Sequence, residues 1–351
     1  MEASTFADHR PSGEGGPMNE MADWPGTRFR AMGSEFGLWL DADQHVAERA
    51  FSRAVAMIDE LEQRMSRFLP ESELNHLNGS SGRPVIVSPG LYEAIHLAVE
   101  MARQTEGFFD PTLLEDLNRV GYDRTLDQME VDGRAVPAPP RGRVRRGWER
   151  ITFVPESMTI TLPAGVKVDL GGIGKGYTAQ KIAEFLGQIG PCLVDAGGDI
   201  VAGEAPRGWD GWPVAVEAPF QGLDSPERDI LGLWLHDAAL TTSGVDRRHW
   251  MRGGQVYHHL IDPLTGIPSS SGLITVSVWH KDGPTAEALA TAALVAGVSE
   301  GIGLIETAGA GGLLVTDTGQ YHLAGTLKEN PLWQVPVIGV QKKSGVTYYG
   351  Y

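Results

Sequence analysis

A glycine-rich stretch that leads into a helix constrains the fold of this chain more than any other part of its sequence. The stretch VDLGGIGKGYTAQKIAEFL runs from Val168 to Leu186, and four glycines surround Lys175 between an apolar run and an amphipathic segment. Glycine lets backbone groups approach a ligand, and the N-terminus of a helix attracts anions. The pattern predicts a strand, a close turn and a helix over roughly residues 176–189. The turn holds either an anion or a solvated lysine, and this stretch alone does not decide between them.

Two common phosphate-binding loops do not match this stretch. A Walker loop requires Ser or Thr after Gly-Lys, whereas Gly174 and Lys175 are followed by Gly176. The dinucleotide fingerprint requires G-x-G-x-x-G, and GGIGKG has a different spacing. An enzyme that uses ATP or NAD is therefore disfavoured.

Helical and strand-like patterns alternate along the chain without regular βαβ order. Residues 45–68 and 283–297 have helical spacing, whereas 28–42 and 166–172 read as strands. This mixture predicts an α+β (mixed α/β) fold. Residues 1–25 are polar and rich in Gly and Pro, which predicts a disordered tail before a single domain over 26–351. Residues 123–148 are rich in Pro, Arg and Gly, which predicts a loop or linker.

Composition excludes several classes of partner and site. The chain has 45 acidic and 29 basic residues, a net charge of -16, which disfavours nucleic acid and anionic membranes as general partners. A single cysteine, Cys192, excludes an intramolecular disulfide. The sequence has neither an apolar run of 18 residues, nor a signal peptide, nor a lipobox cysteine. We therefore expect no membrane span and a cytoplasmic location, or an extracytoplasmic one if the protein starts at a different residue.

Three further groups of residues have the chemistry of a site. Glu287 and Thr291 stand at i and i+4 of a predicted helix, where two hard oxygen ligands could meet a magnesium ion. His259 precedes a predicted turn and is suited to act as a general base. The segment TTSGVDRRHW contains hydroxyls and paired arginines suited to anionic oxygens. Taken singly, each group is more often an ordinary surface or structural feature.

Taken together and in order, segments between about residues 30 and 325 resemble the ApbE family of FAD:protein FMN transferases. The segments that carry the resemblance are AMGSEF, MSRFLPESELNHLN, GFFDPT, VDLGGIGKGY, LVDAGGDI, TTSG, YHHLIDPLTGIP and AEALATAAL. The resemblance implies a two-lobed fold with FAD in the cleft between the lobes. It also implies Mg²⁺-dependent transfer of FMN to a Thr or Ser hydroxyl of an acceptor protein, with release of AMP.

The resemblance assigns roles to particular residues of this chain. It implies that FAD is bound by Met32, Ser66, Arg67, Phe68, Asp110, Pro111, Thr112, Asp169, Lys175 and His259. It implies that Mg²⁺ is bound by the backbone carbonyl of Gly172 and the side chains of Glu287 and Thr291. His259 matches the candidate general base, and Lys175 is the second catalytic residue.

This sequence departs from the family pattern at one predicted metal ligand. Where the family has aspartate, this chain has Glu287, whose extra methylene moves the carboxylate by about 1.5 Å. Two alternative functions therefore stay open: a protein that binds FAD without transferring it, and an FAD pyrophosphatase that releases FMN and AMP. An acceptor protein with a motif like S/T-G-A-T would favour transfer over hydrolysis.

Overall fold

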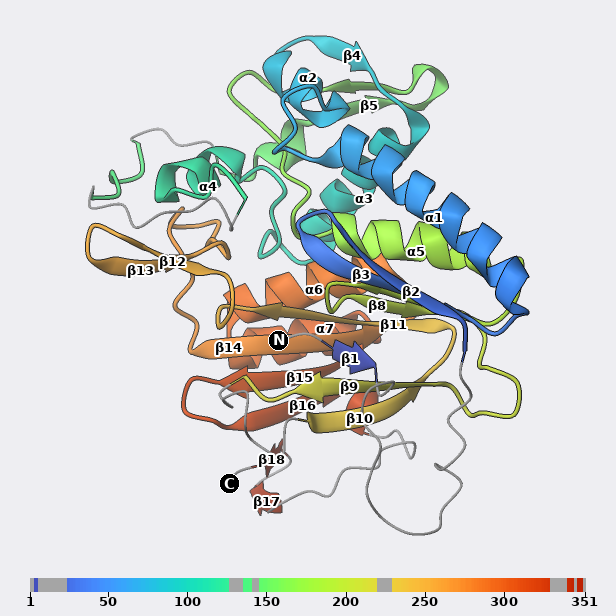
Figure 1. Ribbon diagram of the computed structural model, residues 1–351. Helices are drawn as coiled ribbons and strands as arrows, with labels where there is room; N and C mark the ends of the chain where they lie inside the picture. Colours follow the sequence, from blue (N-terminus) through green and yellow to red (C-terminus); the bar gives the residue numbers. More distant parts are fainter. Residues whose placement is uncertain are drawn as a thin grey trace.

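The main element of the computed structural model is a large antiparallel sheet (Figure 1). The structure describes residues 3–5, 24–125, 135–140, 145–219, 229–328, 340–343 and 346–349. Within that part of the chain, the sheet has ten strands, and every neighbouring pair is antiparallel. In spatial order they are β17 (Val340–Lys343), β18 (Val346–Tyr349), β16 (Tyr321–Gly325), β15 (Gly311–Thr316), β14 (Leu273–His280), β11 (Ala238–Gly244), β8 (Ile200–Ala202), β7 (Cys192–Ala196), β3 (Ser34–Leu40) and β2 (Gly26–Ala31).

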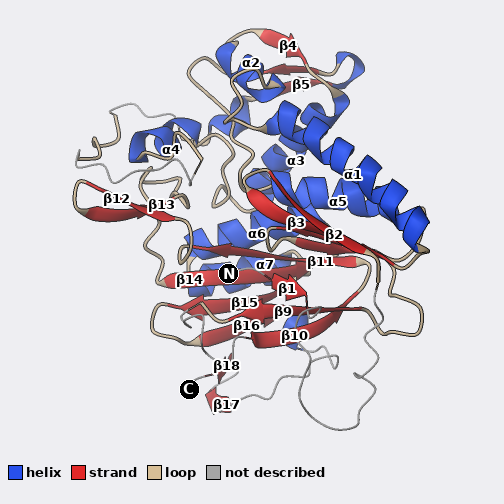
Figure 2. Ribbon diagram, in the orientation of Figure 1, coloured by secondary structure: helices blue, strands red, loops and turns tan. Residues whose placement is uncertain are grey.

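Helices cover one face of this sheet (Figure 2). They are α1 (Gln44–Met65), α5 (Gly174–Gly187), α6 (Gly283–Ala296) and α7 (Val298–Thr307), and α3 (Pro89–Gln104) packs on α1 and α6. In α1, Ala47, Ala50, Ala54 and Ile58 recur at helical spacing and are buried. In α6 most side chains are buried, and many are alanines, which let this helix pack closely between α5 and the sheet. The main hydrophobic core lies between these helices and the sheet.

A small sheet packs against the other face of the large sheet. Its strands, in spatial order, are β1 (Ala3–Thr5), β9 (Trp212–Glu217) and β10 (Asp229–Leu235). Trp212, Val214 and Leu235 from this sheet meet Leu240 and Leu313 from the large sheet in a second core. Strand β1 lies inside the predicted tail, and residues 1–2 and 6–23 of that tail lie outside the described residues.

A smaller lobe sits above the end of the large sheet (Figure 1). It contains α2 (Glu73–Gly79) and the strands β4 (Pro84–Ile86), β6 (Thr159–Thr161) and β5 (Thr152–Val154) in that spatial order. Beside it, α4 (Leu114–Val120) packs on the hairpin of β12 (His249–Arg252) and β13 (Gln255–His258) through Leu117, Val120 and Trp250. Short 3-10 helices span Gly147–Arg150, Pro155–Ser157 and Thr326–Lys328.

The predicted mixed α/β fold with two lobes is confirmed, and one predicted strand is wrong. Residues 166–170 belong to no strand in the described part of the chain, because the Val168 N–H and carbonyl bond the Asn78 side chain and Asp169 N–H donates to the Pro111 carbonyl. The predicted loop over 123–148 falls partly outside the described residues. No helix among the described residues has both the length and the apolar character needed to cross a bilayer.

Candidate active site

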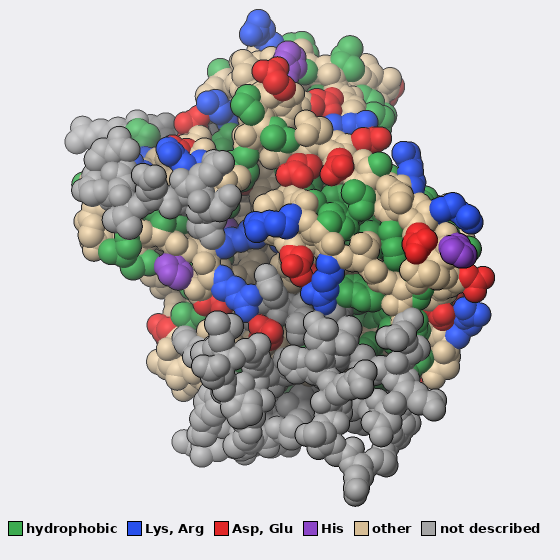
Figure 3. Space-filling model, in the orientation of Figure 1, with side chains coloured by type: hydrophobic (Ala, Val, Ile, Leu, Met, Phe, Trp, Pro, Cys, Tyr) green, Lys and Arg blue, Asp and Glu red, His purple; other side chains and the backbone are tan. Residues whose placement is uncertain are grey.

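A cavity of about 1330 Å³ opens between the small lobe and the end of the large sheet. This volume exceeds the roughly 300–1,000 Å³ of most small-molecule sites, so the cavity can hold a large ligand. Basic side chains surround the hollow in the surface view (Figure 3). The walls come from the β2–β3 turn, the end of α1, the glycine-rich stretch, the loop after β11 and helix α6.

The glycine-rich stretch is held in place from the small lobe by Asn78. The buried Asn78 side chain accepts from Val168 N–H at 2.7 Å and donates to the Val168 carbonyl at 2.8 Å. In the next residue, Asp169 N–H donates to the Pro111 carbonyl at 2.8 Å. Side-chain and loop contacts therefore satisfy the backbone here in place of a neighbouring strand.

Replacing Asn78 with alanine should lower the free energy of unfolding by about 2–4 kcal/mol, because the change leaves one buried N–H and one buried carbonyl unpaired. Urea unfolding monitored by tryptophan fluorescence would measure this loss. The control is His76→Ala, an exposed position on the same helix, which should change stability by less than about 0.5 kcal/mol. Equal stability of the two variants would contradict the anchoring role of Asn78.

Glycines at the start of α5 permit a very close approach of α6. A Cβ atom at Gly176 would lie 2.6 Å from the Gly283 carbonyl oxygen, and one at Gly172 would lie 3.0 Å from the Phe109 ring. Gly176 N–H donates to Glu287 Oε2 at 2.8 Å. The Glu287 carboxylate therefore occupies part of the N-terminus of α5, where the sequence predicted that an anion could bind.

Lys175 lies between two buried carboxylates at the bottom of the cavity. Its Nζ forms an ion pair with Asp199 Oδ2 and lies 3.5 Å from Glu287 Oε1. Asp199 and Glu287 are 1% and 4% exposed, so solvent contributes little to their stabilisation. Burial lowers the pKa of Lys175 and raises the pKa of Glu287. The charged forms of Lys175 and Glu287 are therefore stabilised by neighbouring charged groups of this cluster rather than by water.

The predicted metal ligands meet at the same end of the cavity. Glu287 and Thr291 project from one face of α6, and Gly172 lies close enough that a Cβ atom there would be 3.5 Å from Thr291 Oγ1. Thr291 Oγ1 is 3.0 Å from Ser243 Oγ. Carboxylate, hydroxyl and carbonyl oxygens are the ligands that Mg²⁺ prefers, so this donor set fits the ion. The described residues contain no cluster of three His, Cys, Asp or Glu side chains that could hold a metal, and the predicted set needs only one carboxylate.

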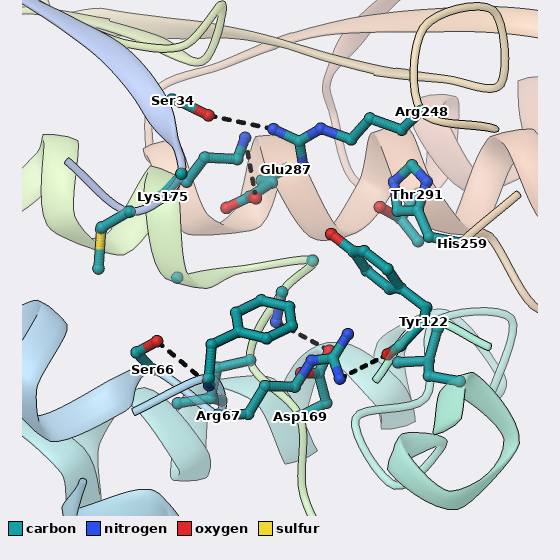
Figure 4. A pocket seen from close by; sticks show the side chains of 18 of the residues that line it. Ser34, Ser66, Arg67, Tyr122, Asp169, Lys175, Arg248, His259, Glu287 and Thr291 are labelled. Carbon is teal, nitrogen blue, oxygen red and sulfur yellow. Dashed lines mark hydrogen bonds and ion pairs between the residues drawn. The ribbon is translucent and has the colours of Figure 1, made fainter. Parts of the chain in front are cut away.

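An aromatic wall with an embedded arginine faces this charged end (Figure 4). Arg67 Nε pairs with Asp169 Oδ1 at 2.9 Å, and Arg67 Nη1 donates to the Tyr122 carbonyl at 2.8 Å. The Arg67 guanidinium lies 4.2 Å from the centre of the Phe68 ring and 4.6 Å from that of Tyr122. The Phe68 and Tyr122 rings are inclined at 69° to each other, and these contacts fix them as an aromatic wall against which an aromatic ligand can pack.

The remaining predicted FAD contacts are distributed around the cavity. Met32 lines it from the β2–β3 turn, where its φ of 50° is unusual for a side chain other than glycine. Ser66 lines it at the end of α1, and its Oγ accepts from Phe68 N–H at 3.3 Å. Asp110 and Pro111 line it too, whereas Thr112 is not among the lining residues and donates to Asp110 Oδ1 instead.

His259 and Arg248 complete the charged end of the cavity. The ring of His259 lies beside Thr291, and the Arg248 guanidinium reaches across to Ser34, whose Oγ accepts from Nη2 at 3.1 Å (Figure 4). Burial, followed by the positive charge of Arg248, lowers the pKa of His259 to about 3. The imidazole is therefore neutral at physiological pH and able to accept a proton.

The structure adds two site residues that the sequence did not single out. Asp199 lies in the turn between β7 and β8. Its carboxylate meets Lys175 only in the folded chain. Tyr122 follows α4, which the sequence did not predict, and its ring stacks on Trp250 at 5.4 Å between centroids. The paired arginines of TTSGVDRRHW did carry a signal, since Arg248 lines the cavity.

Comparisons with known proteins agree with this fold. The ApbE family model matches residues 32–314. A Treponema pallidum protein named FAD:protein FMN transferase is 29% identical over 279 residues, covering 73% of this chain and 74% of that protein. The crystal structure of the ApbE protein from Thermotoga maritima matches with a TM-score of 0.77 and 26% identity, over 87% of this chain and 98% of that one. The flavin transferase ApbE from Vibrio cholerae matches with a TM-score of 0.70 and 25% identity, over 87% and 99% of the two chains. This chain belongs to the ApbE family.

Proposed function

We propose that this chain is an Mg²⁺-dependent FAD:protein FMN transferase, which moves FMN from FAD to a Thr or Ser hydroxyl of an acceptor protein and releases AMP. The observation that carries the proposal is the pairing of an aromatic wall with a charged, oxygen-rich end in one large cavity. A flavin dinucleotide has the same two parts, a flat ring system and a pyrophosphate. The name of the Treponema pallidum relative, FAD:protein FMN transferase, supports the transfer of FMN from FAD to a protein.

The two ends of the cavity would bind different parts of FAD. The ring system would pack against the aromatic wall of Phe68 and Tyr122, beside Arg67. The pyrophosphate would lie near Lys175, where a cation in a poorly solvated site interacts strongly with phosphoryl oxygens. Glu287, Thr291 and the Gly172 carbonyl would hold Mg²⁺, which when bound supplies positive charge to the phosphoryl oxygens.

In the proposed reaction, the acceptor hydroxyl oxygen attacks the phosphorus on the FMN side of the pyrophosphate. The new oxygen–phosphorus bond forms as the bond to the bridging oxygen breaks, and that oxygen leaves with AMP. His259 would take the hydroxyl proton, because a threonine hydroxyl is a poor nucleophile until its proton has an acceptor. Lys175 would stabilise the charge that spreads over the phosphoryl oxygens.

The test is to incubate the purified chain with FAD and Mg²⁺, with and without a protein domain that carries an S/T-G-A-T motif. Chromatography would follow AMP, and mass spectrometry would follow the acceptor. AMP together with an acceptor heavier by one FMN would establish the transferase. AMP with free FMN, whether or not the acceptor is present, would establish a pyrophosphatase. FAD that stays bound and intact would establish a flavin-binding protein and contradict the proposal.

Replacing Glu287 with glutamine tests the proposed metal site, because glutamine keeps the shape and removes the charge. We expect the Mg²⁺ concentration for half-maximal AMP release to rise by more than about tenfold, since a neutral amide is a much weaker ligand for this ion. The matched control is Glu184→Gln, an exposed glutamate on α5, which should leave the Mg²⁺ requirement unchanged. An unchanged requirement in the Glu287 variant would remove Glu287 from the metal site.

A further inference from the structure

One partly buried cation in the cavity has no carboxylate partner. The Arg248 guanidinium donates to the neutral Ser34 hydroxyl at 3.1 Å, and it forms no ion pair with any carboxylate in the part of the chain that the structure describes. Two other cations that line the cavity are paired: Arg67 pairs with Asp169, and Lys175 pairs with Asp199 and Glu287. Among the described residues, the carboxylate that interacts with the Arg248 charge is Glu287, which lies beyond ion-pair distance and is already paired with Lys175.

The position of Arg248 is set by two distant parts of the chain. It lies in the loop between β11 and β12, and Ser34, which is 214 residues away, begins β3 and also lines the cavity. Because Ser34 is buried, the bond to its hydroxyl holds the guanidinium across the cavity rather than in solvent. Figure 4 shows the guanidinium close to Lys175 and Glu287, at the charged end.

An arginine in this position is matched to an anion with several oxygens. The guanidinium offers five N–H donors in a planar fork, and only one bond to Ser34 is formed. A partly desolvated guanidinium with no carboxylate at ion-pair distance is incompletely compensated, and a bound phosphoryl group would relieve that cost. The positive charge of Arg248 also lowers the pKa of His259, which indicates that the field of the guanidinium reaches the proposed base.

We infer that Arg248 is a catalytic residue that binds the pyrophosphate oxygens of FAD and stabilises the charge that develops on the transferred phosphoryl group. The inference rests on the proposed function, and it adds a residue to the reaction. During the attack of the acceptor hydroxyl, negative charge spreads over the phosphoryl oxygens and the departing bridging oxygen. Arg248 and Lys175 then flank that charge from two sides, and Ser34 is a positioning residue that aims the arginine.

The experiment compares Arg248→Ala and Arg248→Lys with the wild-type chain, using ADP as a probe for the pyrophosphate and riboflavin as a probe for the ring system. For Arg248→Ala we expect ADP affinity to fall by at least about tenfold and riboflavin affinity to change by less than about twofold. We expect kcat for FMN transfer to fall by about 10²–10³-fold, the effect of removing one donor to a developing oxyanion. Arg248→Lys should retain part of the kcat that Arg248→Ala loses, because lysine keeps the positive charge but lacks the planar set of N–H donors.

Two further variants separate a direct role from a structural one. Ser34→Ala removes only the hydroxyl that holds the guanidinium, so it should weaken ADP binding by less than Arg248→Ala and leave riboflavin binding unchanged. Arg207→Ala, an exposed arginine paired with Asp41 outside the cavity, is the matched control and should match the wild type in every assay. If Arg248 only held the fold together, both probes would bind less tightly in Arg248→Ala, and lysine would restore neither.

The outcomes also separate this inference from the proposed function. If the wild type transfers FMN and Arg248→Ala keeps both its kcat and its ADP affinity, the role of Arg248 is overturned while the function stands. If the wild type binds FAD but transfers nothing, the proposed function fails. In that case equal ADP affinity of the wild type and Arg248→Ala overturns the binding role, and a selective loss of ADP affinity upholds it.

Discussion

Lys175→Met should destabilise the chain by about 3–5 kcal/mol at pH 7 and abolish FMN transfer. Methionine keeps most of the length of lysine but removes the charge between Asp199 and Glu287, which are both buried. A buried carboxylate that loses its partner is far more costly than a missing surface contact. Transfer would be lost as well, because Lys175 is the proposed cation beside the pyrophosphate.

The loss of stability in Lys175→Met should depend on pH in a defined direction. Burial already raises the pKa of Glu287, and removal of the lysine raises that pKa further. Below the ordinary pKa of a carboxyl, the group is protonated in both the folded and the unfolded chain, so it adds no penalty. As the pH rises toward 7, the Glu287 carboxyl ionises freely only in the unfolded chain, so the free energy of unfolding of the variant falls. The variant should therefore lie closest to the wild type near pH 4–5.

Thermal unfolding from pH 4.5 to 8, with and without Mg²⁺, would measure this effect. Mg²⁺ should raise the Tm of Lys175→Met more than that of the wild type, because a divalent cation can replace the missing charge between the two carboxylates. Lys181→Met is the matched control, since Lys181 lies on the same helix and forms surface ion pairs with Glu93 and Glu184. Equal pH dependence of the two variants would show that Lys175 does not compensate the buried carboxylates.

His259→Ala should lower kcat for FMN transfer by about 10²–10⁴-fold, the usual contribution of a positioned general base. FAD binding should change much less, since the aromatic wall and the cations at the charged end are untouched. Stopped assays of AMP release, together with equilibrium titration of FAD, separate the two quantities. His258→Ala is the natural control, because this neighbouring imidazole contacts the Ser269 carbonyl at 3.0 Å and does not line the cavity.

The pH dependence of the wild type offers an independent check on His259. Only the neutral imidazole accepts a proton, so activity is lost as the pH falls through the pKa of His259. That pKa is about 3 in the chain without ligand, partly because of the nearby charge of Arg248. Bound pyrophosphate would offset this positive charge and raise the pKa. The acid limb of kcat, which reports the complex, should therefore lie at higher pH than that of kcat/KM, which reports the free enzyme. Coincident limbs, or full activity of His259→Ala, would rule out His259 as the base.

Local patterns in the sequence predicted those parts of the site that depend on a single element. The i and i+4 spacing of Glu287 and Thr291 placed both side chains on one face of a helix, and α6 has that geometry. The turn before α5 was also predicted, because glycines next to an amphipathic segment are typical of a helix start. The strand expected over 166–172 failed because a buried asparagine, Asn78, satisfies the backbone there, and a hydrophobic pattern contains no information about such a partner.

Contacts between distant segments could not be predicted in the same way. Gly176 and Glu287 are 111 residues apart, and nothing in either local pattern indicates that the glycine N–H will donate to that carboxylate. Tyr122 was missed for the same reason. It follows α4, and its ring is placed by Trp250 of the β12–β13 hairpin, a contact between distant segments that no local pattern indicates.

The distribution of the site along the chain has a consequence for biosynthesis. The cavity needs the β2–β3 turn near one end of the described chain and helix α6 near the other, and the bond between Ser34 and Arg248 alone spans 214 residues. Such long-range closures form late, after the intervening segments have been ordered. A nascent chain on the ribosome therefore has no place for FAD until α6 has emerged. Under the proposed function, FAD would therefore enter as a substrate only after these distant segments have come together.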